Sequence, residues 1–335
     1  MKFLITLAMT TSLVVLSAAA NAATTQWTLA YLAVKGTIYE EVALAIPDRI
    51  AAATDGQVKI TANSSLVAGN RLLEGVRDGL VEIAMPLSGY YSGSQPLFTI
   101  PSLPGFSESF EDLAALGASK YGADVEAVYR DAYHSTQLMQ MAFCPQVLFS
   151  TKPIATLADW AGKKLRVNNR GTGLVAAELG ATPVSLSAGE VLPALERGVI
   201  DGVITDSCWA YGAGFGTVVS HAADWPMGSV VPFPVLVNDD AWAKLGDDLR
   251  TRVAAEFKRI EADFARRWRE RAAEMPQLWR AAGIAYTEVP QAEMAKVYSD
   301  AVQAPVLEAW RADMKRAGLD ADAALATARA AIGAE

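Results

Sequence analysis

Strand-like and helix-like segments alternate along the first part of this chain, and this alternation restricts the fold more than any other feature. Apolar strand patterns and amphipathic helix patterns follow one another in the order β–α–β–α–β, over residues 27–32, 39–54, 57–62, 72–79 and 81–86. In such an order each helix returns the chain to the same end of the sheet. We therefore expect a parallel sheet with helices on both faces.

The alternation occurs a second time further along the chain. Strands are predicted at residues 137–142, 164–167, 182–184 and 202–205, and helices at 173–179 and 188–197. The segment 143–149 is then the first crossing between two lobes, and a strand at 234–238 returns to the first lobe. The predicted fold class is therefore α/β, with two lobes and a ligand cleft between them.

A long segment without glycine follows, from Asp247 to about Ala282. Its apolar residues recur at spacings of three and four, which places them on one face of a helix. Two interpretations are open: two helices broken near Pro276, or one helix that lies across both lobes. We favour the second. The lobes then comprise residues 23–146 with about 233–265, and residues 147–232 with about 266–335.

The first 22 residues have the pattern of a cleavable signal peptide. Lys2 precedes an apolar stretch at residues 3–16, and Ala20-Asn21-Ala22 has the small-x-small pattern of a signal-peptidase site. The alternative, a membrane-spanning helix, needs about 20 apolar residues. We therefore expect a mature chain that begins at Ala23, lies in the periplasm and is not embedded in the membrane.

The formal net charge of −8 argues against a nucleic-acid partner, because no basic surplus is present to neutralise phosphates. Cys144 and Cys208 are compatible both with a disulfide and with two buried thiols. Zinc is not expected, since His134 and His221 do not lie at ligand spacing to the cysteines. We predict no metal, no cofactor and no catalytic residue.

Seven blocks of the sequence resemble the solute-binding proteins of TRAP transporters, the DctP type. They lie at residues 63–66, 73–79, 100–104, 150–159, 162–167, 177–184 and 189–202, so the resemblance covers essentially the whole mature chain. It implies a periplasmic binding protein-like fold, in which crossing strands and a long helix join the two lobes. It also implies that a carboxylate-bearing solute binds in the cleft and is delivered to a permease driven by an ion gradient.

Two other functions are compatible with two lobes and a cleft. A periplasmic enzyme would need a positioned acid, base or nucleophile, and the sequence contains no nucleophile-elbow motif or metal constellation. A binding protein of an ATP-driven importer or of a sensor kinase would have a similar frame. The blocks around Arg166 and Asp201-Gly202 favour the TRAP receptor.

Arg166 is the strongest candidate for a solute contact. It lies at the end of a predicted strand, where open α/β sheets bind their ligands, and its planar guanidinium matches both oxygens of a carboxylate. The family's carboxylate clamp corresponds to this position; a surface salt bridge is the alternative. Gln146, at the crossing, is either an amide contact or a hinge hydrogen bond. Asn168 should emerge on the same side of the strand as Arg166.

The resemblance places a further solute contact at Thr205, after the strand that follows Asp201-Gly202. Asp206 would repel an anionic solute unless it orients Arg166 or accepts a hydroxyl of the solute. Trp209 is either a flat wall for the solute or a core residue.

In the first lobe, Ser88 and Tyr90 follow the third predicted strand and should line the cleft. Leu32 and Ala33 end the first strand where some relatives carry polar contacts. An apolar pocket with few polar anchors is therefore expected. We infer a monocarboxylate solute with an apolar or aromatic body.

Overall fold

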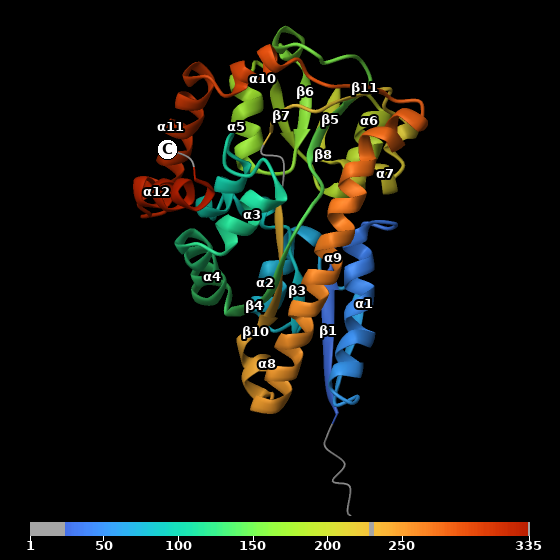
Figure 1. Ribbon diagram of the computed structural model, residues 1–335, viewed down its shortest axis with the longest axis vertical. Coiled ribbons are helices and arrows are strands. Elements are labelled where there is room, and N and C mark those ends of the chain that lie inside the picture. The colour runs from blue at the N-terminus through green and yellow to red at the C-terminus, as the bar shows by residue number, and fades with distance from the viewer. Residues whose placement is uncertain (1–23, 228–230, 334–335) are drawn as a thin grey trace, which may run out of the picture.

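The chain folds into two lobes, each built on a mixed sheet with helices around it (Figure 1). The computed structural model describes residues 24–227 and 231–333, so the predicted signal peptide lies outside the described residues. The first sheet has the order β2 (Val58–Asn63), β1 (Thr25–Tyr31), β3 (Ile83–Met85), β10 (Pro232–Asn238), β4 (Ser135–Ala142). The second has the order β11 (Ala285–Thr287), β9 (His221–Ala223), β5 (Gln146–Ser150), β8 (Gly202–Asp206), β6 (Lys164–Val167), β7 (Thr182–Ser185).

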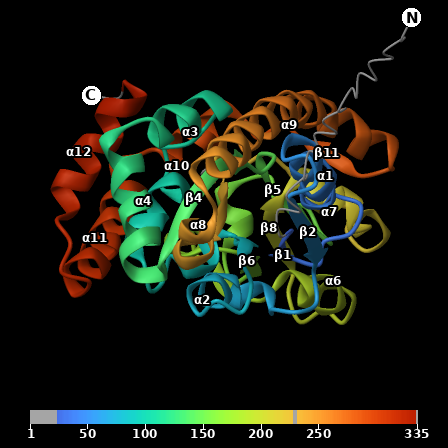
Figure 2. The ribbon, with the colours of Figure 1, turned by 90° about the horizontal axis from the view of Figure 1, so that it is seen from below.

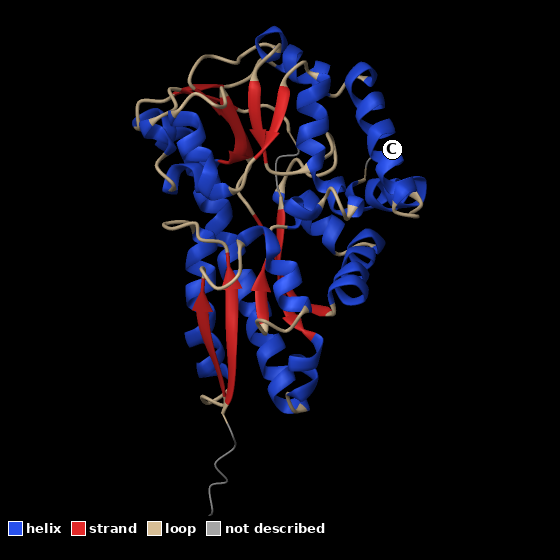
Figure 3. Ribbon diagram, turned by 180° about the vertical axis from the view of Figure 1, so that it is seen from behind, coloured by secondary structure: helices blue, strands red, loops and turns tan. Residues whose placement is uncertain are grey.

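Helices cover both lobes (Figure 3). They are α1 (Ile38–Ala53), α2 (Leu72–Arg77), α3 (Phe110–Gly117), α4 (Lys120–Tyr133), α5 (Arg170–Glu178), α6 (Ala188–Glu196), α7 (Ser207–Gly212), α8 (Asp239–Lys244), α9 (Asp247–Ala281), α10 (Gln291–Val297), α11 (Asp300–Arg316) and α12 (Ala321–Ile332). Within the described ranges, none of them combines the length and the apolar character that crossing a membrane requires.

The first three strands are parallel, as their order predicts, but the complete sheets are mixed. β2, β1 and β3 are parallel, but β10 runs antiparallel to both β3 and β4. The reason is topological: β10 returns from the second lobe and therefore enters the first sheet from the opposite end. The segment expected only to cross between lobes also contains a strand, β5, which pairs antiparallel with β8 and β9.

The segment from residue 247 to 281 is one helix, α9, as the second interpretation predicts. It has 35 residues, which at 1.5 Å per residue gives a length of about 50 Å. In the first lobe α9 packs against α1 and β4, and in the second against α7 and β11 (Figures 1 and 2). Pro276 is inside the helix, and buried Met275 and Trp279 anchor the turns on either side of it.

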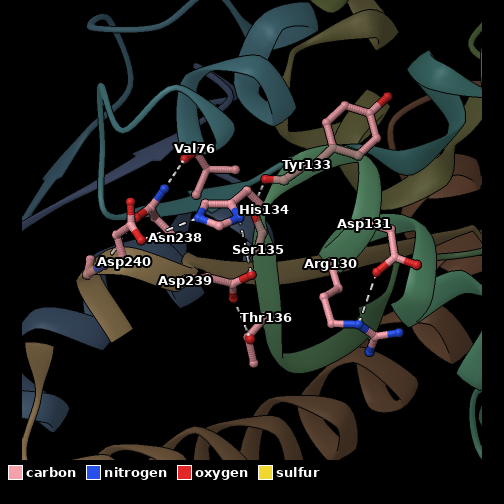
Figure 4. A network of polar contacts seen from close by, with 11 residues as sticks. Val76, Arg130, Asp131, Tyr133, His134, Ser135, Thr136, Asn238, Asp239 and Asp240 are labelled. Carbon is pink, nitrogen blue, oxygen red and sulfur yellow. Dashed lines mark hydrogen bonds and ion pairs between the residues drawn. The ribbon is translucent and has the colours of Figure 1, made fainter. Parts of the chain in front are cut away.

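A polar network fixes the return strand at the far end of the first sheet (Figure 4). The amide of Asn238 donates to the Val76 carbonyl at 2.8 Å, while its oxygen accepts from the backbone N–H of Ala241 and caps α8. The Thr136 hydroxyl donates to Asp239 at 2.7 Å. These contacts join α2, β4 and α8 to β10, so the strand that comes back from the second lobe is held at its end.

The interior contains three clusters of buried side chains. One of them includes side chains of both sheets, such as Leu236 of β10 and Leu165 of β6. The C-terminal helices, which were not predicted from the sequence, contribute side chains to this cluster. α11 packs against α5, and α12 packs against α3 and α4. The lobes are therefore in apolar contact on the side of these helices.

Candidate ligand-binding site

A cavity lies where strands of the two sheets end toward one another. Its walls come from the carboxyl ends of β1, β3, β6 and β8, from the first turns of α1 and α7, and from α9. The carboxyl ends of strands are where open α/β sheets bind ligands. The cavity has a volume of about 40 Å³, measured as the space open to the centre of a water-sized sphere.

Among the described residues that line this cavity, Arg166 is the only one with a positively charged side chain. It is 1% exposed, and its Nε and Nη2 both donate to the Leu186 carbonyl, at 3.0 and 2.9 Å. Burial lowers the pKa of Arg166, and a hydrogen bond with Tyr90 acts in the opposite direction. Among the described residues no acidic side chain forms an ion pair with it. A buried guanidinium without a counter-ion favours an anion at this place.

Gln146 and Asp206 face one another across the β5–β8 pair. Directly opposite residues have Cβ atoms ~5 Å apart. Asp206 caps α7 by accepting from the backbone N–H of Trp209. Burial raises its pKa to about 7, although the nearby N–H groups of Trp209, Cys144 and Cys208 partly offset that effect. Within the described part of the chain, Gln146 Oε1 and Asp206 Oδ2 are buried without a hydrogen-bond partner.

The two cysteines form a disulfide, which decides between the two possibilities left open by the sequence. Cys144 lies in the crossing segment between β4 and β5, and Cys208 in the first turn of α7, with Cα atoms 5.8 Å apart. The Asp206 carboxylate lies within 4.8 Å of both sulfurs. Because a disulfide offers no thiolate, this cluster lacks the donors of a zinc site. The bridge instead ties the crossing segment to the end of β8.

An aromatic cluster makes the first-lobe wall of the cavity. Tyr39 stacks on Phe143 with ring centroids 5.7 Å apart and planes 16° apart, and both rings contact Phe233. Trp268 of α9 meets Phe143 edge-on at 6.2 Å. Thr37 fixes the position of Tyr39 by capping α1: its hydroxyl donates to the Val34 carbonyl and accepts from the Glu40 N–H. The wall is therefore rigid and apolar.

Most residues singled out in the sequence lie together at this cavity. Its lining includes Gln146, Arg166, Asn168, Thr205, Asp206, Trp209 and Tyr90. Leu32 lines it as well, whereas Ala33 is exposed. Ser88 does not: its hydroxyl forms a 2.8 Å hydrogen bond with that of Tyr129, below the cavity wall. The position after β3 is right, but the turn at residues 88–91 directs Tyr90 rather than Ser88 to the cavity.

The structure shows which of the alternative roles Asp206 and Trp209 have. Asp206 does not orient Arg166, because no ion pair or hydrogen bond joins them in the described structure; it caps α7 instead. Trp209 lines the cavity and also packs edge-on against Phe215 at 5.0 Å. Sequence reasoning missed Tyr39 and Trp268. Tyr39 follows the first strand, which was an available signal, whereas nothing local to the long helix marks Trp268.

Residues 29–312 match the family described as bacterial extracellular solute-binding protein, family 7, the DctP type. The chain belongs to this family. It is therefore a receptor of the TRAP type, and the family consists of solute-binding proteins. A solute-binding protein of Roseobacter denitrificans is 26% identical over 298 residues, which are 84% of this chain and 87% of the relative.

Other relatives and solved structures agree with this assignment. A monocarboxylate 2-oxoacid-binding periplasmic protein of Nostoc sp. is 30% identical over 159 residues, 47% of this chain and 43% of that protein. In fold, the chain is similar to a Bordetella pertussis extracytoplasmic solute receptor binding pyroglutamic acid. The TM-score is 0.82 at 24% identity, with 91% of this chain and 99% of the other covered. The chain therefore has the two-lobe fold of the TRAP receptors.

Proposed function

We propose that this protein is a periplasmic receptor that captures a small organic monocarboxylate and delivers it to a TRAP permease driven by an ion gradient. In this proposal residues 1–22 direct export and are removed. The lobe of residues 23–146 with about 233–265 and the lobe of residues 147–232 with about 266–335 close around the solute. Hinge closure of this kind is common among two-lobe binding proteins.

The observation that carries the proposal is the buried Arg166. An isolated buried charge is costly, so proteins normally pair it or neutralise it. Here two donors of the guanidinium are held by one backbone carbonyl, and the side chain lies in the wall of the cavity between the lobes. A carboxylate placed against it would gain charge-assisted hydrogen bonds in a site that excludes water.

The lining supports a compact solute with a largely apolar body. Leu32, Leu87 and Val231 lie beside the aromatic wall formed by Tyr39 and Phe143. Relatives and fold neighbours are named for small acids, among them pyroglutamate, 3-hydroxybenzoate and L-galactonate.

Ligand screening with a matched pair of variants tests the receptor function. Organic acids of two to ten carbons are screened by thermal shift, and the best ligands are titrated calorimetrically. Arg166→Ala should weaken binding by about 2–5 kcal/mol, because the carboxylate loses a desolvated partner. Arg197→Ala, an exposed position at the end of α6, is the control and should bind like wild type. Equal affinity of all three proteins would refute the clamp.

Delivery to a TRAP permease is tested by transport. Membrane vesicles that contain the permease subunits encoded next to the receptor gene should accumulate the labelled acid only when receptor and ion gradient are both present. Uptake that requires ATP instead would favour the ATP-driven importer. Turnover of a tightly bound ligand by the purified protein would favour an enzyme.

A further inference from the structure

Buried polar atoms without a partner concentrate at the proposed ligand site. Seven such side-chain atoms occur in the described ranges, and three of them belong to residues that line this one cavity. The three are Gln146 Oε1, Asp206 Oδ2 and Trp268 Nε1. Leaving a buried donor or acceptor unpaired costs a protein on the order of 1–3 kcal/mol per group. A ligand with matching donors and acceptors would offset this cost at all three residues.

Two of the three atoms are acceptors placed opposite one another. Gln146 and Asp206 are direct partners in the antiparallel β5–β8 ladder, and both lie at the cavity end of their strands. An ionised carboxylate and an amide oxygen cannot satisfy one another, because neither carries a hydrogen. The Asp206 carboxylate is also held in place, since its other oxygen caps α7. A ligand group that donates a hydrogen bond would satisfy these two acceptors together.

The third atom has the opposite character. The indole N–H of Trp268 is a donor only, and Trp268 contributes to the lining of the same cavity from α9. Arg166 supplies further donors from the β6 side. The lining thus presents one cationic fork, one neutral donor and two facing acceptors. Beside them lie the polar side chains of Tyr90, Asn168 and Thr205 and a set of apolar side chains.

On the basis of the proposed function, we propose that the ligand is a monocarboxylate that also carries an N–H or O–H group, which Gln146 and Asp206 receive while Arg166 holds the carboxylate. The Trp268 indole donates to an oxygen of the same ligand. Hydroxy acids, phenolic acids and lactam acids have these features, whereas simple alkanoates and benzoate lack the donor. The chemical class is therefore narrower than small monocarboxylates in general.

Pairs of similar acids, of which only one carries an N–H or O–H donor besides the carboxyl group, test this proposal. Pyroglutamate has a lactam N–H, and 5-oxotetrahydrofuran-2-carboxylate replaces that N–H by a ring oxygen. 3-Hydroxybenzoate and benzoate form the aromatic pair, and lactate and pyruvate the smallest one. In at least one pair, calorimetry at pH 8 should show that the donor-bearing acid binds about 10- to 100-fold more tightly than its partner. The reason is that an acid without the donor leaves two buried acceptors unpaired.

Substituting Asp206 tests whether the preference for donor-bearing acids arises at this side chain. Asp206→Asn keeps an oxygen that can cap α7, because Asn and Asp cap helices equally well, but replaces the second acceptor by an amide donor. The preference for the donor-bearing acid should then fall at least tenfold or invert. Asp320→Asn makes the same change at the exposed cap of α12 and should leave the preference at its wild-type value.

The pH dependence provides a further check. A proton on Asp206 would allow its hydroxyl to donate to Gln146 Oε1, so the preference should shrink at pH 5.5. Arg166, Tyr39 and Tyr90 are the other ionisable groups in the lining. If wild type binds donor-free acids as tightly as their partners in every pair at pH 8, this proposal is refuted and the receptor function stands. If no carboxylate binds at all, the receptor function itself is refuted.

Discussion

The ionisation of Asp206 should make the stability of the free protein fall as the pH rises. Its carboxyl is fully buried at the end of β8, and its pKa moves from the ordinary value of 3.8 to about 7. A carboxyl whose pKa is raised on folding binds more protons in the folded than in the unfolded state between these two values. The stability it contributes is therefore complete below about pH 4 and is lost as the pH rises through about 7.

The size of the effect follows from the shift. The pKa changes by about three units, and each unit corresponds to about 1.4 kcal/mol, so the change amounts to about 4 kcal/mol at most. The slope is about 1.4 kcal/mol per pH unit between pH 4 and pH 7. Asp206→Asn removes the ionisable group and retains the α7 cap, so this component of the slope should disappear in the variant.

Urea unfolding from pH 4 to pH 8.5, followed by tryptophan fluorescence, measures how the unfolding free energies of wild type and Asp206→Asn change with pH. The free energy of unfolding of wild type minus that of Asp206→Asn should decrease by up to about 4 kcal/mol across the range. Asp320→Asn alters an exposed cap on α12 and should retain the wild-type slope. A constant difference between wild type and Asp206→Asn would refute the argument, since Asp206 would then be charged in the folded protein throughout.

Two further predictions concern the disulfide and the lobes. Replacing Cys144 and Cys208 by serine removes a bridge between residues that are 64 apart in sequence. By the loop-entropy relation for disulfides, the free energy of unfolding should then fall by about 4 kcal/mol. Urea unfolding of the oxidised wild type and the double variant measures it, and equal stabilities would contradict it. Saturating ligand should reduce the radius of gyration in solution scattering, because the lobes close by a hinge motion; an unchanged radius would contradict closure.

The sequence predicted those features that depend on local pattern. The two rounds of strand and helix, the return strand near residue 235 and the long helix all appear in the structure at nearly the expected positions. Arg166 could be singled out because a strand end, an invariably charged side chain and the resemblance of its block coincide at one residue. The continuation of α9 past Pro276 was harder to predict, because whether a helix tolerates a proline depends on the packing around it.

The direction of the returning strand, β10, could not be predicted from the sequence. The apolar pattern of residues 232–238 is the same in a parallel and in an antiparallel strand, so only the route of the chain between the lobes made β10 antiparallel. The strand at residues 146–150 was overlooked for a related reason. Both of its neighbours, β8 and β9, come from segments more than 50 residues further along the chain.

Sequence alone determined that this chain makes two α/β lobes, carries an export pattern and places an arginine at a strand end, because periodicity, capping and short motifs act between near neighbours. Only the tertiary structure decided that Cys144 and Cys208 are joined, that Asp206 faces Gln146, and that Trp268 completes the cavity. These residues are far apart in sequence. Their contacts arise from the packing of whole strands and helices, which no local pattern specifies.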